Sequence, residues 1–217
     1  MVEIAILGVG EAGACYADDL AAAGAHVRTW DPDGSRSRTA ASAEDAVRGA
    51  DVVLSVNAAA AALDAARGVA GALGAGQVYA DLNTSAPALK RELAAIVEPT
   101  GASFADVALL AAVPGRGLRT PAFASGSGAE ELARVLGPLG MAVETIDGGA
   151  GAAAERKLLR SVFMKGMAAA ATESLEAAEA AGCADWLHDD IAREIGAPLL
   201  DRLVEGSRRH ARRRVHE

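Results

Sequence analysis

Short apolar runs alternate with alanine-rich helical stretches along the first 148 residues of the chain. Runs of four to seven apolar residues fit buried strands, and their alternation with helices predicts a parallel sheet with right-handed crossovers. We expect strands at residues 2–7, 26–30, 51–56, 77–81, 103–107, 122–125 and 141–146.

Helix start signals occur between several of these runs. Ser42 with Asp45 three residues later is a helix N-cap pair, and Ser127 with Glu130 forms a capping-box pattern. Thr84 or Ser85 is expected to cap a helix that is entered through Pro87. Further helices are predicted at residues 11–23 and 58–73.

The pattern changes at residue 152, after which no strand signal remains. One long helix is predicted over residues 152–181, followed by helices near 186–195 and 198–215. The glycine-rich stretch 148–151 marks the change. We therefore predict a Rossmann-type, doubly wound α/β domain over residues 1–148 and a small all-helical domain over residues 149–217.

Composition narrows the class of protein. The chain is 51% hydrophobic but only 3% aromatic, so its core must consist of Ala, Val and Leu. A net charge of −8 and a pI near 5.1 argue against nucleic acid as a partner. The two cysteines and four histidines show no metal-ligand spacing. With neither a signal peptide nor a long apolar run, we expect a soluble, cytoplasmic protein without a metal.

A G-x-G-x-x-G motif lies between the first predicted strand and the first predicted helix. In this context the motif predicts dinucleotide binding. Gly8 permits the tight turn, Gly10 lets the backbone approach a pyrophosphate, and Gly13 lets the helix pack on the strand. The cofactor-binding candidates within the motif are Gly8, Val9, Gly10, Glu11, Ala12 and Gly13.

Asp31 ends the second predicted strand, eighteen residues after Gly13. A carboxylate there accepts hydrogen bonds from ribose hydroxyls and repels a 2′-phosphate, which favours NAD. Arg36 and Arg38 lie close enough to pair with a phosphate, so NADP remains possible. Asn57 and Thr84, which follow the third and fourth strands, complete the cofactor-binding candidates.

Four stretches together resemble the β-hydroxyacid dehydrogenase family, which includes 3-hydroxyisobutyrate dehydrogenase. They are the glycine motif, the segment Asp81-Leu82-Asn83-Thr84-Ser85-Ala86-Pro87, the loop that opens at Asp106, and Gly151 followed by Lys157. The second is similar to the family's Asp-x-Ser-Thr-x-x-Pro. The resemblance implies a nicotinamide cofactor, a hydroxyacid substrate and subunit contacts through the helical domain.

The chain departs from the family pattern in three places. Asn83 replaces the serine of the second motif, the Ser-Gly-Gly expected after Asp106 is absent, and Ser161 stands where an asparagine is usual. Residues 152–217 also form a shorter helical part than the family's. The segment 207–214 resembles an internal helix of a family branch with a compact C-terminal domain, in which further helices would follow Glu217.

Oxidation of a hydroxyl by a nicotinamide needs a base for the proton. Lys157 is the catalytic candidate, in a crevice between the domains where burial and its neighbours Arg156 and Arg160 would lower its pKa. Ser161, one helical turn on, is a substrate-binding candidate. A solvated surface lysine is the alternative interpretation.

Arg116 and Arg119 flank a Pro-Gly loop beyond a strand's carboxyl end, where ligands of open α/β sheets bind. Either can clamp a substrate carboxylate, although solvated loop arginines fit the sequence equally well.

We therefore predict an NAD(P)-dependent oxidoreductase that acts on a small hydroxyacid or the matching carbonyl. The alternatives are an imine reductase-like enzyme and a catalytically silent dinucleotide-binding module. A homodimer is expected, because the apolar positions Met167, Ala171, Leu175, Ala178 and Ala181 form a stripe on the long helix.

Overall fold

The computed structural model describes the backbone of residues 1–211 and the side chains of residues 1–206. By its contacts the chain divides into two units, Met1–Lys157 and Leu158–Glu217. The division falls inside the long helix α6 (Ala152–Ala180), whose first six residues belong to the first unit.

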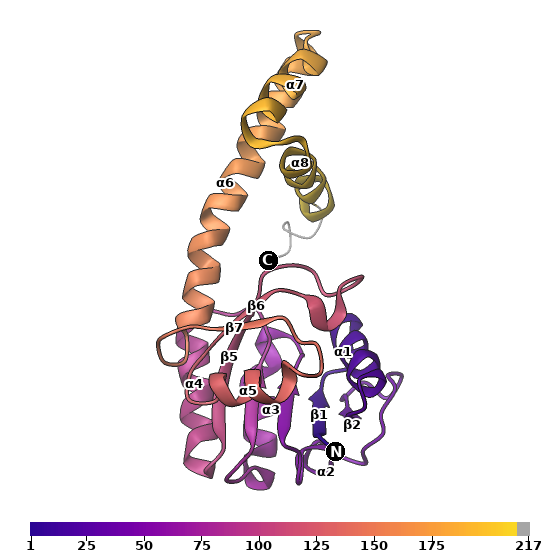
Figure 1. Cartoon of the computed structure of the whole chain (residues 1–217), viewed down its shortest axis with the longest axis vertical. Coiled ribbons are helices and arrows are strands. Elements are labelled where there is room, and N and C mark those ends of the chain that lie inside the picture. The colour runs from indigo at the N-terminus through magenta and orange to yellow at the C-terminus, as the bar shows by residue number, and fades with distance from the viewer. Residues whose placement is uncertain (212–217) are drawn as a thin grey trace. The chain divides into compact units, whose positions relative to one another are not determined.

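The first unit contains a seven-stranded sheet in the order β2-β1-β3-β4-β5-β6-β7, with β4 at its centre and β1 next to the edge strand β2 (Figure 1). All neighbouring strands are parallel except β5 and β6, which pair antiparallel. The strand order reverses between β1 and β3, so the sheet's switch point lies beside the glycine motif. The strands are β1 (Glu3–Leu7), β2 (His26–Trp30), β3 (Val52–Ser55), β4 (Val78–Asp81), β5 (Ser103–Leu109), β6 (Ala122–Ser125) and β7 (Val143–Thr145).

Helices cover both faces of this sheet (Figure 1). Helices α1 (Glu11–Ala22) and α5 (Ala129–Leu136) pack on one face, and bury Tyr16, Leu20, Leu132 and Leu136 against alternate strand residues. The other face is covered by α2 (Ala43–Val47), α3 (Ala62–Val69) and α4 (Pro87–Val97). The predicted doubly wound α/β fold is confirmed.

Short 3-10 turns extend several of these elements. They are η1 (Ala59–Ala61), η2 (Ala70–Ala72), η3 (Glu98–Thr100) and η4 (Gly117–Arg119).

Of the predicted helix caps, one is confirmed and two are wrong. Ser42 Oγ accepts from the N–H of Asp45 at 3.1 Å, as expected. Ala86, not Thr84 or Ser85, precedes α4, and no side chain caps it. Ser127 does not cap α5 because its hydroxyl donates to Glu98 and accepts from the N–H of Phe104.

The second unit consists of the rest of α6 with α7 (Ala184–Ile195) and α8 (Ala197–Ala211). The predicted end of the last helix, near Val215, lies outside the described residues. Within residues 1–211, no helix is long and apolar enough to span a membrane.

The homodimer expectation assumed that the helices after residue 182 leave this stripe uncovered, and for most of the stripe this is wrong: Met167 and Leu175 are half-buried, and of the five residues Ala181 alone is exposed. Ala171 and Ala178 are buried, and residues of α6, α7 and α8 line one common pocket. Leu200 and Leu203 of α8 are buried as well. Among the described side chains of this unit, the large apolar ones that remain exposed are instead Leu158, Leu159, Val162, Phe163 and Trp186.

Candidate functional site

The glycine motif forms the turn from β1 into α1, and two of its glycines are required by the backbone. Gly8 has a φ of 102°, and a Cβ on it would lie 2.5 Å from the carbonyl oxygen of Val56. A Cβ on Gly13 would lie 1.9 Å from the carbonyl oxygen of Gly8. These positions therefore hold the helix against the strand, and no larger residue fits there.

Gly10 is different, because nothing lies within 4 Å of where its Cβ would be. It is the N-cap residue of α1, with extended backbone and no side-chain capping hydrogen bond. The free space and the uncapped N–H groups suit an anionic pyrophosphate that approaches the backbone at this point. The residues of the motif therefore fit a dinucleotide.

Asp31, at the end of β2, contacts the motif directly. Its Oδ2 accepts from the N–H of Val9 at 2.6 Å, and its Oδ1 accepts from the N–H of Asp33 at 2.9 Å. Arg36 Nη1 lies 3.4 Å from the carbonyl oxygen of Val9, so this arginine also reaches the motif.

A pocket of about 270 Å³ opens beside this turn, at the carboxyl ends of β1 and β2. Its lining is mostly apolar, and Trp30 and Pro32 provide flat surfaces of the kind on which an adenine ring packs. The lining residues are Leu7, Gly8, Trp30, Pro32, Ala43, Asn57, Ala61, Asp64 and Ala65.

A network of amide and carboxylate groups joins the ends of β3 and β4. Asn83 Nδ2 lies 2.9 Å from Oδ1 of Asn57, 2.5 Å from Oδ1 of Asp81 and 3.3 Å from Oγ of Ser55. Asn83 is the residue that departs from the serine of the family motif. Its side-chain amide links the segment that follows β4 to the end of β3.

Lys157 lies at the same edge of the sheet, and its Nζ donates to Thr84 Oγ1 at 2.8 Å. The structure thus joins the catalytic candidate to a cofactor-binding candidate. Partial burial is the main cause that lowers the pKa of Lys157 to about 8, and the positive charge of Lys90 lowers it further, whereas Asp106 raises it. The expected direction of the shift is confirmed, but the nearby positive charge is Lys90 and not Arg156 or Arg160.

The loop that carries Arg116 and Arg119 is anchored on α1. Asp19 Oδ2 accepts from the N–H of Leu118 at 2.9 Å, and a Cβ on Gly117 would collide with the same carboxylate. Both arginines are exposed. Ser161 is half-buried on α6 and belongs to the second unit. The substrate-binding roles of all three residues stay predictions.

Sequence reasoning missed a buried ion cluster beneath this edge. Lys90 is 1% exposed and lies between Asp81 and Asp106, both of which are fully buried. A signal was present: Lys90, Leu93, Ala94 and Val97 share one face of α4, and all four are buried. A lysine in such an apolar stripe needs buried acidic partners.

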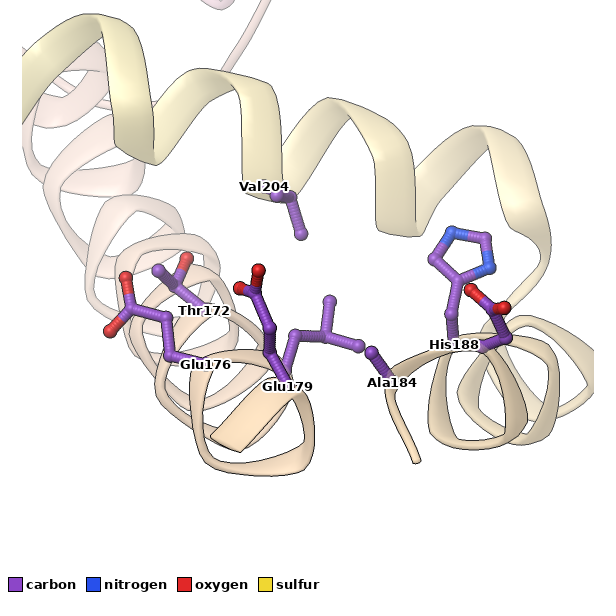
Figure 2. Close-up of a pocket in the computed structure, with 8 residues that line it drawn as sticks. Thr172, Glu176, Glu179, Ala184, His188 and Val204 are labelled. Atoms are coloured by element: carbon purple, nitrogen blue, oxygen red, sulfur yellow. The ribbon is translucent and has the colours of Figure 1, made fainter. Parts of the chain in front are cut away.

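The helical unit has a pocket of its own, of about 200 Å³ (Figure 2). Glu176 and Glu179 of α6 lie on one side of it, and His188 of α7 points toward α8 on the other. His188 Nε2 lies 3.3 Å from Asp201 Oδ1. In the described part of the chain, no three His, Cys, Asp or Glu side chains are arranged to hold a metal.

Fold and site together define an NAD-binding domain of the Rossmann type. Residues 3–140 match the family described as the NAD binding domain of 6-phosphogluconate dehydrogenase. The chain therefore belongs to this family, among the 3-hydroxyisobutyrate dehydrogenase-like β-hydroxyacid dehydrogenases.

Three relatives illustrate the match. An uncharacterized 28.5 kDa protein from the 7S RNA 5′ region of Methanothermus fervidus is 29% identical over 177 residues, which span 80% of this chain and 67% of the relative. The conserved protein MTH1747, of unknown function and similar to 3-hydroxyacid dehydrogenases, has a TM-score of 0.80 at 28% identity, over 97% of this chain and 84% of that one. Mycobacterium tuberculosis 3-hydroxyisobutyrate dehydrogenase, solved with L-serine, has a TM-score of 0.79 at 26% identity. The match covers 90% of this chain and 72% of that one.

Proposed function

We propose that the protein is an NAD(P)-dependent oxidoreductase that oxidises a small hydroxyacid or reduces the matching carbonyl compound. The observation that carries this proposal is the place of Lys157. A lysine with its pKa lowered to about 8 stands at the carboxyl edge of the sheet, joined to Thr84. A half-buried lysine beside charged partners at a sheet's carboxyl edge is typical of an acid/base site, which favours an enzyme over a silent binding module.

The cofactor would bind with its pyrophosphate at Gly10 and its adenosine part in the pocket beside Trp30 and Pro32. When bound, the nicotinamide supplies the hydride acceptor or donor. We infer that NAD is preferred, since the Asp31 carboxylate stands where a 2′-phosphate would be repelled. Arg36 and Arg38 leave NADP possible.

Lys157 would act as the general acid or base for the hydroxyl proton. Its neutral form accepts the proton during oxidation, and its ammonium form donates one during reduction. A pKa of about 8 leaves both forms populated near neutral pH. Arg116 or Arg119 would pair with the substrate carboxylate, and Ser161 would help to hold the substrate.

The test combines binding with turnover. NADH and NADPH are titrated against the purified chain by calorimetry, and a panel of hydroxyacids, their oxo forms and cyclic imines is then screened for a change in nicotinamide absorbance. Binding with Lys157-dependent turnover supports the proposal. Binding without turnover on any hydroxyacid, oxoacid or cyclic imine would favour the silent module.

We also propose a cytoplasmic homodimer that joins through the helical unit. The apolar set Leu159, Val162 and Phe163 on α6 is exposed at 65–74% of each residue's surface and recurs at helical spacing. A second copy of the chain is the occupant we favour, since two-fold dimers are the commonest homo-oligomers and use the same surface of both copies.

A further inference from the structure

The buried cluster of Lys90, Asp81 and Asp106 connects α4 to the ends of two strands. Lys90 Nζ lies 2.7 Å from Oδ2 of Asp81 and donates to that residue's carbonyl oxygen at 2.8 Å. It lies 3.2 Å from Oδ1 of Asp106, an ion-pair distance without hydrogen-bond alignment. Three buried charges are a poor way to stabilise a fold, because their loss of hydration offsets most of their attraction. Stability alone therefore does not account for this cluster.

The second oxygen of Asp106 extends the cluster to the first turn of α6. Oδ2 accepts from the N–H of Gly151 at 3.1 Å and from the N–H of Ala154 at 2.9 Å. Ser125 Oγ accepts from the N–H of Ala153 between them. A carboxylate at this place satisfies N–H groups that have no partner within the helix and interacts favourably with the helix dipole.

The start of α6 is also fixed by close backbone packing on α4. Gly151 has a φ of 99°, and a Cβ on it would lie 2.8 Å from the carbonyl oxygen of Pro87. Lys157 follows Ala154 by three residues, nearly one turn along the same helix. The position of its side chain over Thr84 therefore depends on how the first turn is held.

Two charged groups from neighbouring elements act on Lys157, Lys90 of α4 and Asp106 of β5. Asp81 of β4 is paired with Lys90, and Arg91 of α4 lies beside Gly151 at the start of α6. On its own helix, Glu155, Arg156 and Arg160 are exposed. Lys90 acts on Lys157 in the direction opposite to Asp106, and burial acts in the same direction as Lys90.

We propose that Lys90 is a positioning residue for the acid/base Lys157. Its buried ammonium holds the Asp106 carboxylate on the first turn of α6, and its positive charge faces Lys157 so that the neutral amine is accessible near neutral pH. Lys90 touches no reacting atom. It acts only through its contact with Asp106 and through the electrostatic effect of its positive charge on Lys157. This inference rests on the proposed function of Lys157.

The test measures the ionisation of Lys157 itself. The chain has only three lysines, Lys90, Lys157 and Lys165, so lysine labelled with ¹³C at Cε gives three NMR signals. Lys157→Arg and Lys165→Arg assign them. Because the titration needs neither cofactor nor substrate, its result is separate from that of the turnover assay.

Two variants should shift the Lys157 titration in opposite directions. Lys90→Met removes the repelling charge, so the pKa of Lys157 should rise from about 8 toward its ordinary 10.5. Asp106→Asn removes the attracting charge but keeps an oxygen for the two N–H groups, so the pKa should fall below about 8. A general loss of structure would not produce shifts of opposite sign. The exposed Lys165→Met is the matched control and should leave the Lys157 signal in place.

An unchanged Lys157 titration in a folded Lys90→Met chain would overturn the proposal, as would shifts of the same sign in both variants. If Lys90→Met fails to fold because two buried carboxylates lose their partner, Asp106→Asn decides the question, since Lys90 keeps Asp81 there. Where turnover is present, the pH at which the rate changes because Lys157 ionises should shift in each variant in the same direction as the NMR titration.

Discussion

The backbone N–H of Val9 donates to Oδ2 of Asp31 at 2.6 Å, and this bond joins the two halves of the dinucleotide fingerprint. The glycine turn after β1 and the acidic end of β2 are thus one structural unit, although twenty-two residues separate them. The Asp31 carboxylate is held in place before any ligand arrives, which lowers the entropic cost of binding.

The glycines of the motif should separate binding from folding. Gly10→Val should fold normally, because the backbone there is extended and nothing lies within 4 Å of its Cβ position. The added methyl groups would fill the space that the pyrophosphate needs, so NADH affinity should fall by at least about tenfold, or roughly 1.4 kcal/mol. Gly13→Val is the contrasting variant and should lose thermal stability, since its Cβ would strike the carbonyl of Gly8. Unaltered NADH binding by folded Gly10→Val protein would show that the pyrophosphate does not bind at this turn.

Cofactor choice should depend on the charge of Asp31. Calorimetry should show tighter binding of NADH than of NADPH to the unaltered chain. Asp31→Asn keeps an oxygen that can accept from Val9 but removes the charge that repels a 2′-phosphate. The ratio of NADH affinity to NADPH affinity should therefore fall by about tenfold. Tighter NADPH binding by the unaltered chain would show that Arg36 and Arg38 outweigh the carboxylate.

The periodic features of this chain could be predicted from its sequence, whereas features that depend on distant partners could not. Strand runs, the glycine turn and the Ser42 cap are local patterns, and the structure has them. Ser127 shows the limit: its capping-box spacing is correct, but Glu98 and the Phe104 N–H, both far away in sequence, bind its hydroxyl instead. Lys90 was overlooked for the same reason, since its two carboxylate partners come from separate strands.

Turnover should depend on Lys157 and on its ionisation. Lys157→Met should cut turnover by about two to four orders of magnitude with cofactor affinity nearly kept, which is the usual contribution of proton transfer. In the oxidation direction the rate should rise with pH up to about 8, where Lys157 becomes neutral; in reduction it should fall above that value. Lys157→Met should lose this pH dependence in both oxidation and reduction. A variant that retains most of its turnover would move the role to another residue, with Lys165 the first to be tested.

The same shift has a consequence for stability. Because the pKa of Lys157 is lowered in the folded chain, its protonated form is disfavoured there, and this cost is present below pH 8. Between pH 8 and 10.5 the folded chain releases the proton first, so the cost fades as pH rises. Lys157→Met should therefore keep or raise Tm at pH 7, and its advantage should shrink by pH 10. A large loss of Tm at pH 7 would mean that the hydrogen bond to Thr84 outweighs the burial of the charge.

The last prediction concerns assembly through α6. The part of the α6 stripe around Ala171 and Ala178 is buried within the helical unit itself. The exposed set of Leu159, Val162 and Phe163 takes its place, and exposed apolar stripes of this kind are normally covered by a partner.

Sedimentation of the unaltered chain at tens of micromolar should show a dimer, and Phe163→Glu should shift it to monomer because a carboxylate cannot be buried there unpaired. Charge reversal at the exposed Lys165 is the matched control on the same helix and should leave the dimer intact. NADH affinity should be equal in both variants, since the glycine motif and its pocket lie entirely within the first unit. A monomeric unaltered chain, or a Phe163→Glu chain that still dimerises, would exclude this face as the subunit contact.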